Sequence, residues 1–377
     1  MLLLGATSHV LGPWIYPPSH ASLRPSFIRL ASDRHDGGDG DDFEDDPYIA
    51  FRSAGTMRRW APASRGSRWQ QRDSKEALAI GELLASKGML QIHGHCAFDS
   101  LQVISRLGEG RFGDVLLCHD ARGGKQYAVK MALRATAELT REARVLSAMR
   151  VHDGFPTFVH HQPARSDQGE LLVMEVLGSS LQERWREATM RDSRSVARVA
   201  AGVLRCLRHL HTAGYVHNDL KPENILFRAN GSTGVDTVNL IDFGRATCPG
   251  LPELARVGGV GSHRWASSAA HNGHCTSAVD DLESAFYVFA FLITGHLPWE
   301  QERWSHVADM KHTLLTRDEC EIFLAGCDAR TRSSPSADAL RLLWTELTSS
   351  RRLEKDADYD LCVEAFDRAA GAASATN

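Results

Sequence analysis

A glycine-rich turn between two short apolar segments is the feature that most limits the folds open to this chain. In dinucleotide-binding folds the motif G-x-G-x-x-G opens a helix. Here the β-forming residues V-L-L-C follow it at 115–118, and the pair Gly123-Gly124 is a hairpin signal before the next apolar run. We therefore predict three antiparallel strands over 101–133, joined first by a turn whose backbone N–H groups can approach a phosphate. The glycines of that turn are Gly108, Gly110 and Gly113.

A lysine and a glutamate follow the turn. Lys130 ends the run Y-A-V-K, and Glu142 comes twelve residues later. The residues after Glu142 have helical periodicity, which places Ala143, Leu146 and Met149 on one face. A lysine that faces a polyphosphate needs a carboxylate to hold its chain and balance its charge. Each residue alone is usually a surface ion, but their combination with the glycine turn indicates a phosphate site.

Two motifs in the middle of the chain supply the remaining chemistry. They are Y-V-H-N-D-L-K-P-E-N-I-L-F at 215–227 and L-I-D-F-G-R-A at 240–246. Phosphoryl transfer depends on positioning and on charge neutralisation rather than on covalent catalysis. In the first motif an aspartate can orient a hydroxyl and accept its proton, and a lysine can reach phosphoryl oxygens. The two motifs also offer oxygen ligands of the kind that Mg²⁺ prefers. These four residues are Asp219, Lys221, Asn224 and Asp242.

These motifs resemble those of the eukaryotic protein kinase catalytic domain, over residues 101 to about 369. H-N-D-L-K-P-E-N matches the catalytic loop, and its K-P-E-N portion is similar to serine/threonine kinases. The resemblance implies an α+β, bilobal fold with a small antiparallel β-sheet N-lobe that has one main helix and a larger, mostly helical C-lobe. We place the N-lobe and hinge at 101–177 and the C-lobe at 178–369.

Within the kinases, the casein kinase I group is most similar. The chain resembles that group in a hinge, a G-S-H-R-W-A-S segment, a D-D-L-E-S helix with the following L-P-W, and a final D-Y-x-x-L helix. Vaccinia-related kinases share several of these features, but K-P-E-N and L-P-W favour casein kinase I. The four segments lie at 170–181, 261–270, 279–300 and 356–366.

The resemblance assigns roles to individual residues and implies ATP and Mg²⁺ as cofactors. Asp219 is the expected catalytic base, with Lys221, Asn224, Lys130 and Glu142 in catalytic support and with Asn224 and Asp242 as metal ligands. Arg264 matches an arginine that binds acidic or phospho-primed substrates, and Lys311 is either a second cation there or a solvated lysine. The expected nucleotide-binding residues are Leu107, Gly108, Glu109, Gly110, Gly113, Val115, Ala128, Lys130, Met174, Glu175, Leu177, Leu226 and Ile241.

Three departures from the kinase pattern carry predictions. Asn218 replaces the arginine that normally pairs with a phosphorylated activation loop, so we expect activity without that phosphorylation. Ser267-Ser268-Ala269 replaces A-P-E, so we expect the usual glutamate–arginine pair of this segment to be absent. Asp281 resembles the aspartate that binds the backbone of the catalytic loop.

The ends of the chain differ from its middle. Residues 1–73 hold an acidic run and an arginine-rich run without periodicity, which predicts a disordered extension. The acid-free residues 1–32 also suit an organelle transit peptide. We interpret 74–100 as a helical lead-in and 370–377 as a tail.

Composition limits the partners and the location of the chain. A net charge of -4 gives no broad positive field for nucleic acid, and the longest apolar run, 285–293, is too short to span a membrane. The eight cysteines form no C-x-x-C pair, so we expect reduced thiols in an intracellular protein. We expect this protein to be a monomer of the cytoplasm or nucleus that acts on protein substrates. The alternatives are a scaffold or binding protein with a kinase fold and a vaccinia-related type of kinase.

Overall fold

The computed structural model of the protein describes residues 82, 86, 88–93, 98–110, 113–120, 122–164, 169–190, 192–228, 237–248, 262–274, 276–300, 302, 304–317 and 319–371. The chain divides into two units, Met1–Asp45 and Asp46–Asn377, and every described residue belongs to the second. The predicted extension 1–73, with its targeting segment, therefore lies outside the described residues, as does the tail beyond Gly371.

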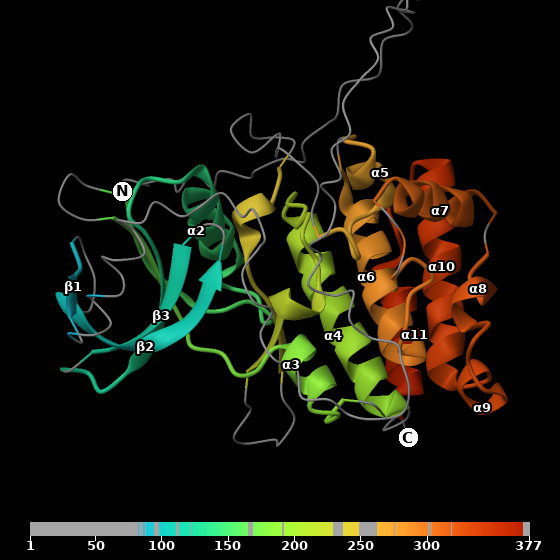
Figure 1. Ribbon diagram of the computed structural model, residues 1–377, viewed down its shortest axis with the longest axis horizontal. Coiled ribbons are helices and arrows are strands. Elements are labelled where there is room, and N and C mark those ends of the chain that lie inside the picture. The colour runs from blue at the N-terminus through green and yellow to red at the C-terminus, as the bar shows by residue number, and fades with distance from the viewer. Residues whose placement is uncertain are drawn as a thin grey trace, which may run out of the picture. The chain divides into compact units, whose positions relative to one another are not determined.

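An antiparallel sheet of six strands forms the first half of the described chain (Figure 1). Its strands follow the order β1-β2-β3-β4-β6-β5. The register sets Val115 opposite Lys130 and Ala128 opposite Met174, so predicted nucleotide-binding residues meet on neighbouring strands. The strands are β1 (Met89–Gln91), β2 (Ser100–Gly110), β3 (Gly113–His119), β4 (Gln126–Ala132), β5 (Phe158–Gln162) and β6 (Glu170–Met174).

The turns on either side of β3 explain its predicted hairpins. Gly113, at the start of β3, has φ 138°, and a Cβ there would lie 2.2 Å from the carbonyl oxygen of Met131. Only glycine fits both the positive φ and this close approach. After β3 the carboxylate of Asp120 accepts the N–H of Gly123 at 2.9 Å, and Gly124 takes φ 67°. The three strands predicted over 101–133 are confirmed.

One main helix, α2 (Ala137–Met149), accompanies the sheet in the described residues. It begins at Thr136, whose hydroxyl accepts the N–H of Leu139 at 3.1 Å and caps the first turn. The predicted apolar face is buried, with Ala143 at 4%, Leu146 at 1% and Met149 at 1% exposure. This burial turns Glu142, on the same helix, toward the sheet.

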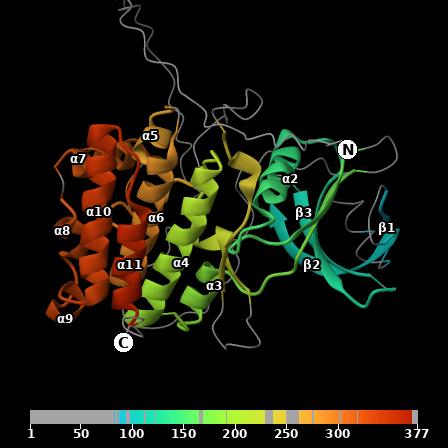
Figure 2. The same ribbon diagram turned by 180° about the vertical axis from the view of Figure 1, so that it is seen from behind.

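Helices make up most of the second half of the described chain (Figures 1 and 2). The central pair is α4 and α6, which pack on each other, while α11 packs on α4 and α10 packs on both α6 and α11. Nearly all of α6 is buried, which fits its sequence, because most of its residues are apolar. The elements are α3 (Leu181–Arg186), α4 (Ser193–Thr212), η1 (Pro222–Asn224), β7 (Ile225–Arg228), β8 (Thr237–Leu240), η2 (Phe243–Arg245), α5 (Ser268–His271), α6 (Ala278–Thr294), α7 (Trp304–Arg317), α8 (Glu321–Leu324), α9 (Ala329–Arg332), α10 (Pro335–Leu353) and α11 (Tyr359–Ala369).

The strands with α2 and the larger helical part form a bilobal α+β fold, as predicted. One boundary prediction is wrong: the lead-in at 74–100 is not helical throughout, because Met89–Gln91 is a strand that pairs with β2. Its three residues show only one buried position, too few for a strand period to be read from sequence. Among the described residues, no helix has the length and apolar character needed to cross a bilayer.

Candidate active site

Lys130 lies between two carboxylates that come from different elements. Its Nζ is 2.6 Å from Glu142 Oε2 on α2 and 2.8 Å from Asp242 Oδ1, just before η2. Burial acts to lower the pKa of Lys130, but the charges of Glu142 and Asp242 outweigh it and raise that pKa. Lys130 is therefore a fixed cation, and the structure brings all three predicted residues together.

Asp242 adopts an unusual backbone that aims its side chain at Lys130. Its φ and ψ are 64° and 67°, in the left-handed region. Phe243, the next residue, is fully buried and packs against the rings of Phe155 and His217, with centroids 5.8 and 5.0 Å away. Burial opposes ionisation of Asp242, yet the charge of Lys130 lowers its pKa below the ordinary value. The carboxylate is therefore charged, and one of its oxygens, Oδ1, pairs with Lys130.

The Asp219 loop, residues 215–224, gathers the other predicted catalytic groups. Lys221 Nζ is 2.7 Å from Asp219 Oδ2, and Asn224 Nδ2 donates to the Asp219 carbonyl at 2.8 Å. The Asn224 carbonyl accepts the N–H of Ile241 at 3.0 Å, which ties this loop to the strand that leads into Asp242. The loop and the residues around Asp242 are therefore one hydrogen-bonded unit.

Ser262 is a site residue that sequence reasoning did not assign. Its N–H and its hydroxyl both donate to Asp219 Oδ1 at 3.2 Å. Asp219 thus has one oxygen held by Lys221 and the other by Ser262. The available signal was weak: Ser262 is one of the few hydroxyl residues between Asp242 and Trp265.

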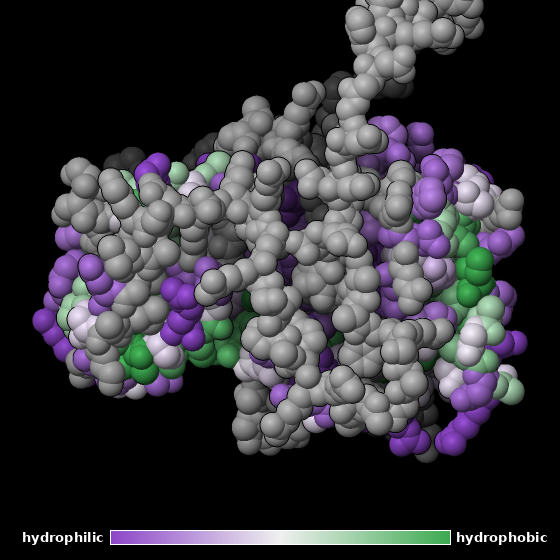
Figure 3. Space-filling model, in the orientation of Figure 1, coloured by the Kyte–Doolittle hydropathy of each residue, from purple (hydrophilic) through white to green (hydrophobic). Residues whose placement is uncertain are grey.

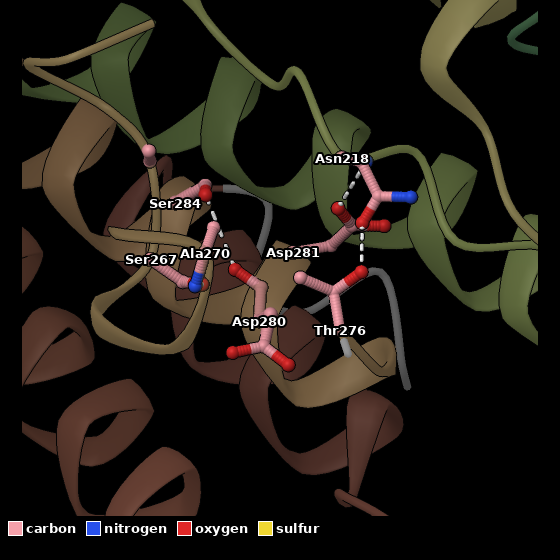
Figure 4. A pocket seen from close by; sticks show the side chains of 8 residues that line it. Asn218, Ser267, Ala270, Thr276, Asp280, Asp281 and Ser284 are labelled. Carbon is pink, nitrogen blue, oxygen red and sulfur yellow. Dashed lines mark hydrogen bonds between the residues drawn. The ribbon is translucent and has the colours of Figure 1, made fainter. Parts of the chain in front are cut away.

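Asn218 takes a left-handed conformation and uses its amide for neutral hydrogen bonds. With φ 66°, its Nδ2 donates to the Arg245 carbonyl at 3.0 Å and to Thr247 Oγ1 at 2.9 Å. Its Oδ1 accepts the hydroxyl of Thr276, beside a small pocket at the start of α6 (Figure 4). Asparagine tolerates this backbone better than most residues. Position 218 therefore carries a neutral amide that is hydrogen-bonded to neighbouring residues, and it carries no positive charge.

Asp281 binds the backbone of the Asp219 loop through both of its carboxylate oxygens. Its Oδ2 accepts the N–H of His217 at 2.6 Å, and its Oδ1 accepts the N–H of Asn218 at 2.9 Å. Asp280, in contrast, accepts the N–H of Ser277 at 2.7 Å in a capping box for α6. The predicted role of Asp281 in binding the backbone of this loop is confirmed.

The predicted nucleotide-binding residues line the sheet and the segment after β6. Leu107 on β2 is 50% exposed, and the face in Figure 3 has apolar surface in the part of the molecule that bears the strands. Glu175 is fixed by its pairing with Arg228 at 2.7 Å. No hydrogen bond among the described residues uses the main-chain groups of Leu177. An exposed apolar side chain and an unused hinge backbone suit a planar, hydrogen-bonding ring.

Other predicted nucleotide-binding residues are placed less directly. Glu109 pairs with Arg106 at 3.0 Å on the exposed side of β2, while Gly108 and Gly110 lie opposite Val115 and Gly113 in the register. Leu226 and Ile241 are each partly buried: Leu226 lies on β7 opposite Asn239, and Ile241 directly follows β8.

The family comparison agrees with this geometry. The protein kinase domain family matches residues 101–352. The chain belongs to the protein kinase domain family. Casein kinase 1-like protein HD16 of Oryza sativa subsp. japonica is 28% identical to it over 291 residues, 70% of this chain and 38% of the rice protein. The chain therefore spans well under half the length of that relative. The predicted family, near the casein kinase I group, is confirmed.

In this kinase, Arg264 and Lys311 do not form an open pair of cations. Arg264 contacts the Glu300 carboxylate and lies over the ring of Phe291, 4.4 Å from its centroid. Lys311 is fully buried and donates to the Ala266 carbonyl at 2.7 Å and the Arg264 carbonyl at 3.1 Å. Both interpretations of Lys311 are therefore wrong: because it is fully enclosed, it is neither solvated nor an exposed cation.

A glutamate–arginine pair does anchor the segment that replaces A-P-E. Glu283 on α6 accepts the Ser268 N–H at 2.7 Å, and its other oxygen is 2.6 Å from Arg351 Nη2. This is not the usual pair whose absence we predicted, because the glutamate comes from α6 rather than from the segment itself. Tyr287 also donates its hydroxyl to Glu283, at 2.5 Å.

Proposed function

We propose that this kinase transfers the γ-phosphoryl group of ATP to serine and threonine hydroxyls of proteins, as a kinase of casein kinase I type. The observation that carries the proposal is the placement of Lys130 between Glu142 and Asp242, next to the linked Asp219 loop. The similarity to a casein kinase 1-like protein and the K-P-E-N motif support the serine/threonine assignment.

Each residue has a role that its contacts support. Lys130, fixed by Glu142, binds phosphate oxygens as a localised cation. Asp219 orients the attacking hydroxyl and accepts its proton, while Lys221 balances charge beside it. The backbone N–H groups of the glycine turn would approach the phosphates, because glycines carry no Cβ that would block them.

Asn224 and Asp242 are chemically suited to hold magnesium. Both offer oxygen ligands, Asp242 is ionised, and Asn224 binds the Asp219 carbonyl through its Nδ2, which leaves its oxygen as a ligand. Bound Mg²⁺ would neutralise charge on the transferring phosphoryl group.

We also propose that the kinase is active without phosphorylation of residues 243–264. A phosphate there would need a cation at position 218, and this chain has an amide whose hydrogen bonds are already formed within the protein. The arrangement of Lys130, Glu142 and Asp242 thus does not depend on Asn218 as a phosphate partner.

The test is ATP turnover with casein and with matched Ser, Thr and Tyr peptides. Asp219→Asn and Lys130→Met should each lower kcat/KM about 10²–10³-fold, because each removes a group that acts in the transition state. Lys125→Met is the matched control, since Lys125 is an exposed lysine just before β4. Undiminished activity in Asp219→Asn would refute the assignment of the base, and preference for the Tyr peptide would refute the substrate class.

A further inference from the structure

The last helix of the chain reaches the Asp219 loop through a buried histidine. His211, in the last turn of α4, has a side chain 6% exposed and lies with Nε2 2.8 Å from Asp281 Oδ2. On its other side, Nδ1 forms a hydrogen bond with the Tyr359 hydroxyl at the start of α11. The rings of His211 and Tyr359 meet edge to face, with centroids 5.7 Å apart. Three side chains from α4, α6 and α11 thus form one line.

The chemistry of each group limits the hydrogen bonds in this line. Burial opposes ionisation of Asp281, but the hydrogen bonds from His211 and the His217 N–H lower its pKa, so it is an acceptor only. His211 therefore donates to Asp281 through its Nε2–H. Burial raises the pKa of Tyr359, so its hydroxyl keeps its proton, and it forms a hydrogen bond with Nδ1 of the same imidazole. Tyr359 therefore fixes the orientation of the His211 ring that binds Asp281.

Asp281 connects His211 to the backbone of the loop that holds the proposed base. The carboxylate oxygen that His211 binds, Oδ2, is the same oxygen that accepts the His217 N–H, and Oδ1 accepts the next N–H along the chain. His217 and Asp219 are two residues apart, and the Asp219 N–H donates to His217 Nδ1 at 3.3 Å. A rotation of Asp281 would therefore shift the backbone that carries Asp219.

We propose that Tyr359 is a positioning residue of the phosphoryl-transfer site, acting through His211 and Asp281. The inference rests on the proposed role of Asp219 as the base. Tyr359 lies after residue 352, where the match to the protein kinase domain ends, so the helix that follows the matched domain takes part in ordering its catalytic loop.

A purely structural role for α11 predicts a different outcome. The helix also holds α4 through exposed ion pairs, Arg208 with Asp360 and Arg205 with Asp367. These pairs stabilise the same helix contact but do not reach Asp281. Asp360→Asn is therefore a matched control: it loosens the same interface next to Tyr359 and leaves the line to Asp281 intact.

The experiment compares Tyr359→Phe with Asp360→Asn in the full chain, with kcat, both KM values and the urea midpoint measured for each. Tyr359→Phe keeps the ring and removes the hydroxyl, and it should lower kcat about five- to tenfold, the worth of one buried hydrogen bond. Both KM values should stay within about twofold, because no substrate contact changes. Asp360→Asn should leave kcat within about twofold.

A second background separates positioning from packing. In His211→Phe, which removes the hydrogen-bonding partner of Tyr359, adding Tyr359→Phe should change kcat less than about twofold, since the two groups act as one unit. An unchanged kcat in Tyr359→Phe, or an equal loss with and without His211, would overturn the proposal. Retained activity in Asp219→Asn would instead refute the proposed base and leave any measured coupling between Tyr359 and His211 standing.

Discussion

Replacing Lys311 by methionine should change how the stability of the kinase depends on pH. Lys311 Nζ donates to the backbone carbonyls of His263, Arg264 and Ala266. It also lies 4.8 Å from the ring centroids of both Tyr287 and Trp299. Burial lowers the pKa of Lys311 from 10.5 to about 7, and the charge of Glu283 only partly opposes this. The ammonium form is thus penalised in the folded protein.

The sign follows from proton counts. Between pH 7 and 10.5 the unfolded chain holds a proton on Lys311 and the folded chain does not, so unfolding takes up a proton and stability rises with pH. One proton is worth about 1.4 kcal/mol per pH unit. Over pH 7.5 to 9.5 the free energy of unfolding of wild type, minus that of Lys311→Met, should therefore rise by about 2.5 kcal/mol.

Urea unfolding followed by tryptophan fluorescence measures this difference, because Trp265 and Trp299 lie in the same region as Lys311. His271, which also contacts Lys311, does not titrate in this range, since burial and the charge of Lys311 lower its pKa to about 3. Leu314→Met is the control, as it places the same side chain at a buried position of the same helix without a titrating group. A difference that stays flat with pH would show that the carbonyls hold Lys311 charged and would refute the reasoning.

Three further outcomes are expected. Phosphatase treatment should leave kcat within about twofold, because Asn218 offers no charge to a phosphate. A more than tenfold loss of kcat, in a sample whose dephosphorylation has been verified, would contradict this. Gly113→Ala should raise the KM for ATP at least about tenfold and lower the melting temperature, since its Cβ meets a main-chain carbonyl of β4; an unchanged KM would count against it. Glu300→Gln should lower the KM for a phospho-primed peptide at least about threefold, because Arg264 loses its competing carboxylate; equal KM values for wild type and variant would refute that role.

The residues nearest the chemistry were predictable because they lie in short motifs with fixed local geometry. The spacing of Lys130 and Glu142 follows from a strand and the helix after it, and Asp219 and Asn224 share one loop. Their relation to Asp242, more than 100 residues from Lys130, could be predicted only through the resemblance to kinases. The sequence motifs alone indicated which charged residues the site requires, but not that Asp242 would contact Lys130.

The supporting contacts were not predictable because they join ordinary residues far apart in sequence. Ser262 binds Asp219, Arg351 binds Glu283, and Tyr359 binds His211, and none of these residues stands in a motif that indicates a partner. Lys311 was misjudged for a related reason. Lysine usually stays in water because burying its charge is costly, and only the tertiary structure shows that Lys311 is enclosed and that burial lowers its pKa.

Helix α6 explains how these separate contacts act together. Asp281 binds the backbone of the Asp219 loop, and Glu283, two residues later, binds the backbone of the segment that starts at Ser268. Both carboxylates are fully enclosed and sit on a helix that is buried along most of its length, so neither can move without the other. The distance between the proposed base and the 262–268 segment is therefore set by one rigid element. Arg351 on α10 binds Glu283 directly, and Tyr359 on α11 reaches Asp281 through His211. Residues far from the Asp219 loop in sequence can therefore affect the geometry at Asp219.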